Sequence, residues 1–454
     1  MRNNNEIEKI INYIKKLNPQ TQNITNTLSF NSKENCKNKV LVLINVNKNN
    51  LYGYVNEGVR NGAIGLITSH AIQKDKLKTK IPYLCSNFLK KNINIFLDHI
   101  YHQPLKNKLI IGITGTDGKT STSYSLAQSY SLIGKTVGLI SSEGNGVFPR
   151  LIKGKYTTPR NDILFKLFHK FNNANVDIII IECSSQGLQQ GRVDNIKFHT
   201  SIVTNINKDH IEYHKSFYNY VKSKARLLEM TKGRIFLNKT CNNSQLLLRY
   251  TKKSQIIYYN PFKINQTLLD PPYGLIENFF HTQGINKKSQ LKIYNNLKKI
   301  PGRSNIIKGR DNTTVVVDYA HTISSFERII KISKKELDYK LLVTVFGCGG
   351  DRDKNKRLQF GRIANKYSDK IILTNDNPRS ENALQILHDI SNGVKNTSKT
   401  EIIANRKSAI KKAIKFSKKG YLILLLGKGN EDEIIYKKRI VKHNDIQYVK
   451  MLLK

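Results

Sequence analysis

The residues best suited to chemistry in this 454-residue chain form a short loop rich in glycine and hydroxyl groups. The loop reads Thr114-Gly115-Thr116-Asp117-Gly118-Lys119-Thr120-Ser121. Small residues let backbone N–H groups approach phosphate oxygens, while the Lys119 ammonium suits the outer phosphates and the Thr120 hydroxyl suits Mg²⁺. The common phosphate-loop pattern places a glycine at position 113, whereas here the glycines stand at 112 and 115. Because Gly-Lys-Thr follows an apolar run and precedes a helical stretch, we still predict a nucleotide-binding loop.

Further along the chain, a carboxylate and two histidines could serve the metal ion of a bound nucleotide, and a lysine follows them. Glu182 ends the apolar run 178–181, where a carboxylate beside a phosphate loop could hold Mg²⁺, although alone it could equally be a surface residue. His210 and His214 stand four residues apart, a spacing also found in zinc sites. A phosphate loop favours Mg²⁺, which prefers oxygen ligands. Lys224, considered by itself on a predicted helix, would be an ordinary solvated charge.

The elements that must position these residues are short apolar runs that alternate with helical stretches. We expect a small α/β domain over residues 1–105, a mostly parallel sheet from 106, and a second doubly wound sheet after about 300. In doubly wound sheets, ligands bind beyond the carboxyl ends of the strands, where the residues above lie. The apolar runs are 40–44, 63–67, 109–113, 177–181, 201–203, 314–317, 341–346, 370–373 and 422–426, and residues 218–230 are predicted to be helical.

The composition excludes some classes of protein. The net charge of +43 would suit a nucleic-acid binder, but the basic residues are dispersed, and abundant Lys, Asn and Ile with no Trp indicate an AT-rich genome. We therefore expect no nucleic-acid partner. Five scattered cysteines without a Cys-x-x-Cys pair favour reduced thiols over disulfides or zinc. Without a long apolar run or a secretory signal, we expect a cytoplasmic protein without a membrane span.

Taken together, the loop and the segments that follow it resemble the Mur ligases, which are cytoplasmic ATP-dependent peptide synthetases of peptidoglycan assembly. The offset glycines are typical of that family's loop. The resemblance covers residues 106–435 strongly and 1–105 faintly. The other matching segments, in the family's order, are Thr157-Thr158-Pro159, Glu182-Cys183-Ser184-Ser185, Arg192-Val193, Thr204-Asn205 with Asp209-His210, Asp318-Tyr319-Ala320-His321-Thr322, Phe346–Asp353 and Gly427-Lys428-Gly429.

The resemblance implies an α/β fold of three domains. Residues 1–105 would bind a UDP-linked substrate, residues 106–299 would form a P-loop ATPase-like parallel sheet, and residues 300–454 would form a Rossmann-like amino-acid domain. It also implies an ADP-forming ligase of peptidoglycan precursor synthesis, which we expect to be a monomer. ATP and Mg²⁺ would convert a substrate carboxylate into an acyl phosphate, which an incoming amine then attacks. Because the carboxylate is a poor electrophile, phosphorylation supplies the leaving group.

The same resemblance assigns roles to single residues. Lys224 corresponds to a lysine that reacts with CO₂, and its carbamate would bind Mg²⁺ together with Thr120, Glu182 and His210. The resemblance implies that the catalytic residues are Lys119, Glu182, His210 and Lys224. Residues matched to ATP contacts are Thr114, Gly115, Thr116, Asp117, Gly118, Lys119, Thr120, Arg303, Asp318 and His321. Residues matched to the UDP-linked substrate are Ser32, Thr157, Thr158, Ser184, Gln190 and Arg192.

The segment Asp376-Asn377-Pro378-Arg379 resembles the signature of the branch that adds meso-diaminopimelate to UDP-N-acetylmuramoyl-L-alanyl-D-glutamate. The guanidinium of Arg379 could grip the distal carboxylate of diaminopimelate in two-point fashion, and lysine lacks that carboxylate. Arg357, Gly427 and Glu431 would complete the pocket, with Glu431 facing the distal ammonium. The chain departs from the family pattern at Asp117, Gln186, Ala383 and Asn430.

Four other interpretations remain open at this stage. The chain could add lysine or another amino acid, or it could be an amide ligase akin to the folylpolyglutamate synthetases, which should lack the segment 376–379. A basic nucleic-acid-binding ATPase would explain the charge, although no nucleic-acid motif is visible. A degenerate, inactive remnant is disfavoured by the intact Lys119, Glu182, His210, Lys224 and Arg379.

Overall fold

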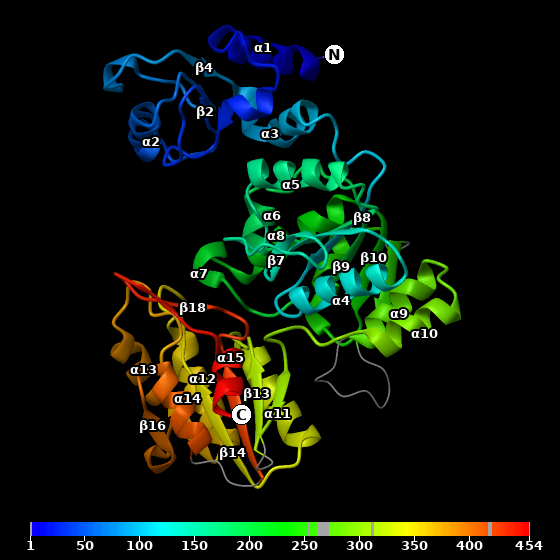
Figure 1. Ribbon diagram of the computed structural model, residues 1–454, viewed down its shortest axis with the longest axis vertical. Helices are drawn as coiled ribbons and strands as arrows, with labels where there is room; N and C mark the ends of the chain where they lie inside the picture. The colour runs from blue at the N-terminus through cyan, green and yellow to red at the C-terminus, as the bar shows by residue number, and fades with distance from the viewer. Residues whose placement is uncertain (1, 253–254, 262–271, 310–312, 416–419, 454) are drawn as a thin grey trace.

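Three β-sheets built from successive stretches of the chain organise the molecule (Figure 1). The computed structural model describes residues 2–252, 255–261, 272–309, 313–415 and 420–453. The N-terminal domain lies at the top of Figure 1, the central domain in the middle and the C-terminal domain at the bottom.

The N-terminal domain is a four-stranded parallel sheet in the order β1-β2-β3-β4. Its two inner strands are apolar and buried along their whole length, as expected for a parallel sheet covered on both faces. Its helices and strands are α1 Arg2–Leu17, β1 Leu28–Ser29, β2 Val40–Leu43, α2 Lys48–Arg60, β3 Gly65–Thr68, β4 Tyr83–Cys85 and α3 Asn87–Ile100, with 3₁₀ turns at Ile24–Thr27 and Lys74–Lys76.

The central domain is a seven-stranded sheet in the order β11-β10-β9-β5-β8-β6-β7, in which β7 alone runs antiparallel to its neighbour. The strand β5 stands in the middle, so the loop that follows it opens where the winding direction reverses. Its elements are β5 Leu109–Thr114, α4 Lys119–Leu132, β6 Val137–Ser141, β7 Gly144–Val147, α5 Asn161–Asn173, β8 Ile178–Glu182, α6 Ser185–Gln189, β9 Phe198–Val203, α7 Ile211–His214, α8 Phe217–Glu229, β10 Thr231–Asn238, β11 Ile256–Tyr259, α9 Tyr273–Thr282 and α10 Lys287–Asn296, with a 3₁₀ segment at Asn242–Tyr250.

The C-terminal domain is a six-stranded sheet in the order β12-β13-β17-β14-β15-β16, parallel except for β12. A small antiparallel pair, β18 and β19, follows it. Its elements are β12 Asn305–Lys308, β13 Thr314–Asp318, α11 Ile323–Glu336, β14 Leu341–Phe346, α12 Asn355–Tyr367, β15 Lys370–Leu373, α13 Ala383–Ser391, β16 Thr400–Ile402, α14 Arg406–Lys415, β17 Tyr421–Leu426, β18 Glu433–Ile435, β19 Ile440–Lys442 and α15 Asp445–Leu452, with a 3₁₀ turn at Thr397–Lys399.

The expected fold class is confirmed, because three α/β domains with largely parallel sheets follow one another along the chain. The predicted strands near 40, 65, 110, 180, 201, 315, 343, 371 and 423 and the predicted helix at 218–230 are present with small shifts of their ends. The strand β10 was not predicted from the sequence, because its first four residues, Thr-Lys-Gly-Arg, are not apolar. The boundary residues 105 and 299 stay a prediction.

A hydrogen-bonded contact joins the N-terminal domain to the central one. The side-chain amide of Asn94 in α3 is buried and donates to the backbone carbonyls of Arg192, at 3.2 Å, and Asp194, at 2.6 Å. Asn161 at the start of α5 donates to the Asn94 carbonyl oxygen at 2.5 Å. The first domain is therefore held against the loop that carries Arg192.

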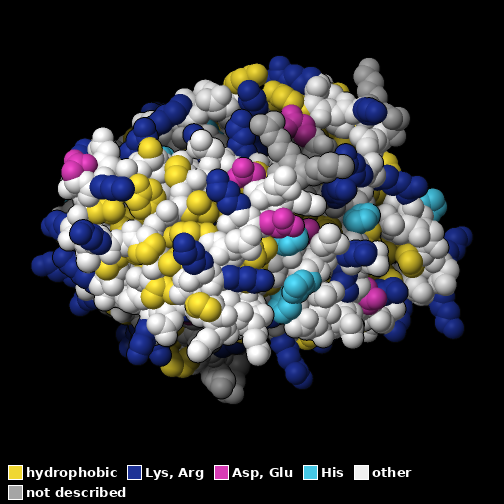
Figure 2. Space-filling model, turned by 90° about the horizontal axis from the view of Figure 1, so that it is seen from above, with side chains coloured by type: hydrophobic (Ala, Val, Ile, Leu, Met, Phe, Trp, Pro, Cys, Tyr) yellow, Lys and Arg dark blue, Asp and Glu magenta, His cyan; other side chains and the backbone are white. Residues whose placement is uncertain are grey.

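The positive charge of the chain is widely distributed. On the face shown in Figure 2, Lys and Arg side chains are scattered across the surface and do not gather in one patch. A membrane-crossing helix is likewise not found: none of the helices within the described residues has the length and apolar character to cross a bilayer.

A buried ion pair joins the first residue of α14 to the first residue of α15. Arg406 donates to both carboxylate oxygens of Asp445, at 2.9 and 2.7 Å, and to the backbone carbonyls of Asn375 and Leu426. His443 contacts the same carboxylate at 2.7 Å. Burial alone would raise the pKa of Asp445, but Arg406 and His443 outweigh it and hold that pKa well below its ordinary value. The carboxylate therefore stays ionised in the core.

We predict that Asp445→Asn lowers the free energy of unfolding of the C-terminal domain by about 3–5 kcal/mol at pH 7, because it leaves Arg406 buried without its counterion. Since folding lowers the pKa of Asp445, the stabilisation is present above the ordinary pKa of about 3.9 and is lost as the pH falls below it. Urea titrations at several pH values measure both effects.

The matched control is Asp432→Asn. Asp432 also pairs with a basic side chain, Lys153 at 2.8 Å, but both side chains are at least half exposed. This substitution should cost less than about 1 kcal/mol. Equal costs for Asp432→Asn and Asp445→Asn would show that the buried pair contributes nothing beyond a surface contact.

Candidate functional site

The phosphate loop turns from β5 into α4, and two of its glycines are required by the backbone. Gly115 has φ +149°, and a Cβ atom there would lie 1.8 Å from the Thr204 hydroxyl oxygen. Gly118 has φ +80° and caps the N-terminus of α4. The glycine at 115 is thus set by close approach to Thr204 after β9. This close approach explains why the glycines of this loop differ in position from those of the common phosphate loop. The sequence alone showed the difference but not its cause.

Two lysines converge on one backbone oxygen of this loop. Lys119 donates to the Gly115 carbonyl oxygen at 2.9 Å, and Lys224, from α8, donates to the same oxygen at 2.6 Å. Lys224 is only 1% exposed, so it is not the solvated charge that its isolated position in the sequence suggested. Burial, together with the charge of Lys119, lowers the pKa of Lys224 well below its ordinary value. These surroundings therefore disfavour the charged form of Lys224.

Glu182, the last residue of β8, is fully buried directly behind the loop. Its carboxylate accepts hydrogen bonds from the hydroxyls of Thr120 at 3.2 Å, Ser123 at 2.9 Å and Ser142 at 3.4 Å. Burial raises the pKa of Glu182, while Lys119 and the Ser123 hydroxyl oppose that rise. A carboxylate in contact with the Thr120 hydroxyl fits the sparse ligand set of Mg²⁺, which takes one or two carboxylates and completes its shell with phosphates and water.

The two histidines have different surroundings. His210 contacts Asp209 at 3.3 Å and Glu212 at 3.6 Å, and burial lowers its pKa to about 3. His214 is buried, and its ring nitrogens contact the hydroxyls of Ser185 at 2.9 Å and Ser223 at 3.3 Å. Across the described part of the chain, no three His, Cys, Asp or Glu side chains are arranged to hold a metal. The structure therefore gives no support to a zinc pair.

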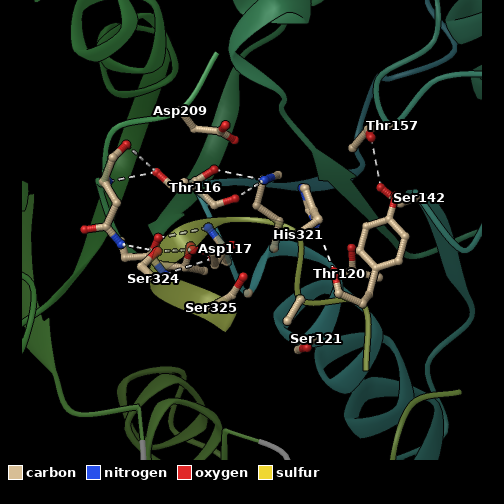
Figure 3. A pocket seen from close by; sticks show the side chains of 18 of the residues that line it. Thr116, Asp117, Thr120, Ser121, Ser142, Thr157, Asp209, His321, Ser324 and Ser325 are labelled. Carbon is tan, nitrogen blue, oxygen red and sulfur yellow. Dashed lines mark hydrogen bonds between the residues drawn. The ribbon is translucent and has the colours of Figure 1, made fainter. Parts of the chain in front are cut away.

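A cavity of about 1070 Å³ lies between the carboxyl ends of the central and C-terminal sheets. Figure 3 shows it from close by, with the loop residues and His321 around it. Candidate residues that line it are Gly115, Thr116, Asp117, Gly118, Lys119, Thr120, Thr157, Ser184, Gln190, Arg192, His210, Lys224, Arg303, Asp318, His321, Asp376, Asn377, Arg379, Gly427 and Glu431. Candidates outside its lining are Ser32, Thr114, Thr158, Glu182, Arg357 and Pro378.

Five of the six residues matched to the UDP-linked substrate cluster beside β8. The Thr158 hydroxyl donates to the Glu182 carbonyl at 2.7 Å and to the Ser184 hydroxyl at 3.1 Å, and Thr157 contacts the Ser142 hydroxyl at 2.9 Å (Figure 3). Arg192 donates to the Thr158 carbonyl and to the Gln190 side chain.

Ser32, the sixth of these residues, lies apart from the cluster in the N-terminal domain. It is buried, and its hydroxyl donates to Glu57 at 2.6 Å. This arrangement does not bring Ser32 to the cavity.

The part of the cavity that the C-terminal domain lines is built around Glu431. Its carboxylate accepts from Lys428 at 2.7 Å and from the Asn377 amide at 2.8 Å, and Tyr319 donates to its other oxygen at 3.2 Å. Burial alone would raise the pKa of Glu431, but Lys428 and these hydrogen bonds outweigh it and lower the pKa. Arg379, at φ +53°, points one nitrogen at the Gly350 carbonyl at 2.7 Å.

Arg357 is 1% exposed and does not reach the cavity. Its guanidinium donates to the carboxylates of Glu381, at 2.9 Å, and Asp389, at 2.8 Å. Arg357 therefore joins α12 to the segment that follows Arg379. It lies outside the residues that line the cavity.

Four residues of the site were not singled out by the sequence. Tyr319 and Lys428 lie inside segments that the resemblance had matched, so their motif was the available signal. Ser142 follows β6, a strand that was not predicted, and Lys356 pairs with Asp209 across the domain interface. Neither of these contacts has a local sequence signal.

The C-terminal domain rests directly on the phosphate loop. The Asp117 carboxylate accepts hydrogen bonds from the hydroxyls of Thr322 and Ser324, both at 3.0 Å, at the N-terminus of α11 (Figure 3). A carboxylate at this position is also favoured by the positive end of the helix dipole. Arg303, between the two sheets, donates to the Thr120 hydroxyl at 3.3 Å. These contacts fix the C-terminal domain against the nucleotide loop.

Comparison with known proteins places these features in a family. A sequence model of the Mur ligase middle domain matches residues 113–306, and a model of the Mur ligase glutamate ligase domain matches residues 302–429. The UDP-N-acetylmuramoyl-L-alanyl-D-glutamate–2,6-diaminopimelate ligase of Wigglesworthia glossinidia brevipalpis is 32% identical, with 94% of this chain and 95% of the relative covered.

Two solved structures share the fold. A UDP-N-acetylmuramoyl-L-alanyl-D-glutamate–2,6-diaminopimelate ligase superposes with a TM-score of 0.61 at 22% identity, over 97% of this chain and 98% of that chain. A folylpolyglutamate synthase of Mycobacterium tuberculosis, complexed with ADP and AMPPCP, superposes with a TM-score of 0.59 at 16% identity, over 73% of this chain and 91% of that chain.

We predict that Asp117→Ala loosens the docking of the C-terminal domain, because the two hydroxyls at the start of α11 lose a charged acceptor worth about 1–3 kcal/mol. The measurement is small-angle X-ray scattering without nucleotide, where the radius of gyration should increase. Asp117→Asn keeps an acceptor oxygen and should leave the radius of gyration close to that of the unmodified chain. An unchanged radius in Asp117→Ala would exclude this contact as a fastener of the two domains.

Proposed function

The chain belongs to the Mur ligase family, and from this premise we propose that it is an ATP-dependent ligase that joins meso-diaminopimelate to UDP-N-acetylmuramoyl-L-alanyl-D-glutamate. One observation carries the proposal: the phosphate loop at 115–120 and the segment from Asp376 to Arg379 contribute to the same cavity. An enzyme that activates a carboxylate and then delivers an amine needs both ends of the reaction in one enclosed space.

In the proposed reaction, a carboxylate oxygen of the UDP-linked substrate attacks the γ-phosphorus of ATP, and ADP leaves. The product is an acyl phosphate. The amine of diaminopimelate then attacks its carbonyl carbon, and the tetrahedral intermediate expels phosphate while the nitrogen loses a proton. Lys119 and the loop N–H groups would neutralise the transferred phosphoryl group, as P-loop lysines do. Mg²⁺, held by Glu182 and the Thr120 hydroxyl, would supply further positive charge at the phosphates.

We also propose that Lys224 carries a carbamate. Two ammonium groups on one carbonyl oxygen repel each other, and burial already favours the neutral amine of Lys224, which is the form that reacts with CO₂. The reaction forms an N–C bond and releases one proton, and the lysine becomes an anion. That anion would attract Lys119 and contribute to the metal site with Glu182 and His210.

The substrate contacts are proposed from the geometry of the cavity. Thr157, Ser184, Gln190 and Arg192 would hold the UDP-linked substrate, with the Arg192 cation facing anionic oxygens, and Thr158 would orient Ser184 and Arg192 from behind. Ser32 is buried against Glu57. It would contact the uridine only after the N-terminal domain changes its arrangement on binding.

ATP would lie between the loop and the junction of the two domains. Arg303, Asp318 and His321 line that part of the cavity.

At the other end of the cavity, Arg379 would pair with the distal carboxylate of meso-diaminopimelate, and Glu431 would face its distal ammonium. Asp376, Asn377 and Gly427 would shape this pocket, and a Cβ atom at Gly427 would come within 2.6 Å of an Asp376 carboxylate oxygen. Arg357 and Pro378 do not line the cavity and would support the residues that do. A lysine substrate would leave Arg379 without a carboxylate partner, which is the physical basis for selectivity.

We further propose that the enzyme acts as a monomer in the cytoplasm, where ATP and UDP-linked precursors are available. The observations in support are the absence of a membrane-crossing helix among the described residues and the presence of the candidate residues for both substrates on one chain.

We predict that phosphate release from ATP requires both the UDP-muramoyl dipeptide and meso-diaminopimelate. Each substrate should be tested alone and together in a phosphate-release assay, with lysine, glutamate and nucleic acid in place of diaminopimelate. Stimulation by lysine would contradict the role of Arg379, and stimulation by glutamate on a pteroate substrate would favour a folylpolyglutamate-type ligase. Arg379→Ala should reduce the preference for diaminopimelate over lysine.

We predict that Lys224→Ala lowers kcat on the order of 100-fold, and that acetate in the millimolar range restores part of it by supplying the missing carboxylate. The matched control is Lys222→Ala, because Lys222 is exposed on the same helix and should be dispensable. Full activity of Lys224→Ala without acetate would exclude the carbamate role.

A further inference from the structure

A continuous series of contacts runs from the nucleotide loop to the amino-acid end of the cavity through a single tyrosine. Arg303 donates to the Thr120 hydroxyl at 3.3 Å, and the guanidinium carbon of Arg303 lies 4.4 Å from the centre of the Tyr319 ring. The Tyr319 hydroxyl donates to Glu431 at 3.2 Å. One ring therefore contacts a residue of each half of the proposed reaction.

Tyr319 has two further close neighbours, His321 and Gly429. His321 stacks edge-on against it, with ring centres 4.8 Å apart, and its Nδ1 contacts the Tyr319 carbonyl oxygen at 2.9 Å. On the other side, a Cβ atom at Gly429 would lie 2.8 Å from the Tyr319 Cβ. Gly429 has φ +53°, so a side chain there would be both strained and obstructed. The backbone at 429 thus comes close to the tyrosine because it carries no side chain.

The hydroxyl of Tyr319 donates a hydrogen bond to one of the two carboxylate oxygens of Glu431. Lys428 and Asn377 both occupy one carboxylate oxygen of Glu431, and Tyr319 is the described donor to the other oxygen. Lys428 is fully buried. Without the tyrosine hydroxyl, the attraction to Lys428 would be unopposed, and the second oxygen would be free to turn away from the cavity.

We propose that Tyr319 is a positioning residue that makes binding of the amino-acid substrate depend on the occupied nucleotide loop. When nucleotide fixes Thr120 and Arg303, the cation–π contact fixes the tyrosine ring, and the ring fixes the Glu431 oxygen that would meet the substrate ammonium. Because coupling between two binding sites is reciprocal, diaminopimelate should tighten nucleotide binding by the same factor. This inference rests on the function proposed above.

The test compares binding of meso-diaminopimelate by the full chain with and without a non-hydrolysable ATP analogue and Mg²⁺, at saturating UDP-muramoyl dipeptide. Isothermal titration calorimetry gives both dissociation constants. In the unmodified chain the analogue should tighten diaminopimelate binding, and in Tyr319→Phe that enhancement should fall about tenfold or vanish. The dissociation constant of the analogue alone should not change in Tyr319→Phe, because the ring that faces Arg303 is kept.

Two further variants separate positioning from general damage. Tyr319→Leu removes the ring as well and should weaken binding of the analogue itself. Tyr367→Phe is the matched control, because the Tyr367 hydroxyl also donates to a glutamate, Glu327 at 2.9 Å, but lies outside the cavity lining. It should behave like the unmodified chain.

An equal enhancement in the unmodified chain and in Tyr319→Phe would overturn the proposed role of Tyr319 while leaving the proposed function intact. If the unmodified chain bound no diaminopimelate under any of these conditions, the proposed function itself would fail, and the role of Tyr319 would fail with it. The two failures are therefore distinguishable in one set of titrations.

Discussion

The site is organised by a constraint on charge, because the amino groups of Lys119 and of the buried Lys224 share the carbonyl oxygen of Gly115 and would repel each other if both were protonated. Lys119 and Lys224 come from different helices, and a low-dielectric interior makes their mutual repulsion costly. Two positive charges this close together are stable only when anions lie near them. Glu182 lies directly behind the loop, and the proposed phosphates, carboxylate substrate and carbamate would supply the remaining negative charge. The metal site, the phosphate loop and the activated carboxylate would therefore all place negative charge near these two lysines.

The fold meets that need by directing the carboxyl ends of two parallel sheets toward one cavity. The central sheet contributes the loop after β5, with the buried carboxylate of Glu182 behind it, and the C-terminal sheet contributes the segments after β13, β15 and β17. Polar contacts join these two domains at the cavity itself, with Asp117 against α11 and Lys356 against Asp209. Polar contacts of this kind can form and break as substrates bind, unlike the apolar core of each domain.

Much of this arrangement could be predicted from the sequence, and the remainder depends on contacts between distant residues. The apolar runs predicted most strands, and the strand before Glu182 placed that carboxylate beside the loop. Lys224 shows the limit of local interpretation, because its burial depends on how α8 packs under the loop and not on its neighbours in the chain. The pairs Tyr319–Glu431 and Asp117–Ser324 join residues more than 100 positions apart, so no local pattern could reveal them. Ser32 and Arg357 matched the family by position, but their side chains are buried against carboxylates here.

The central claim is that the site activates a carboxylate by phosphorylating it, and an oxygen-transfer experiment tests this most directly. The UDP-muramoyl dipeptide would be prepared with ¹⁸O in both oxygens of the reacting carboxylate and incubated with ATP, Mg²⁺ and meso-diaminopimelate. Because the bridging oxygen of an acyl phosphate leaves with the phosphate, mass spectrometry should find one ¹⁸O atom in each inorganic phosphate released. Tripeptide formation accompanied by unlabelled phosphate would contradict the acyl-phosphate account.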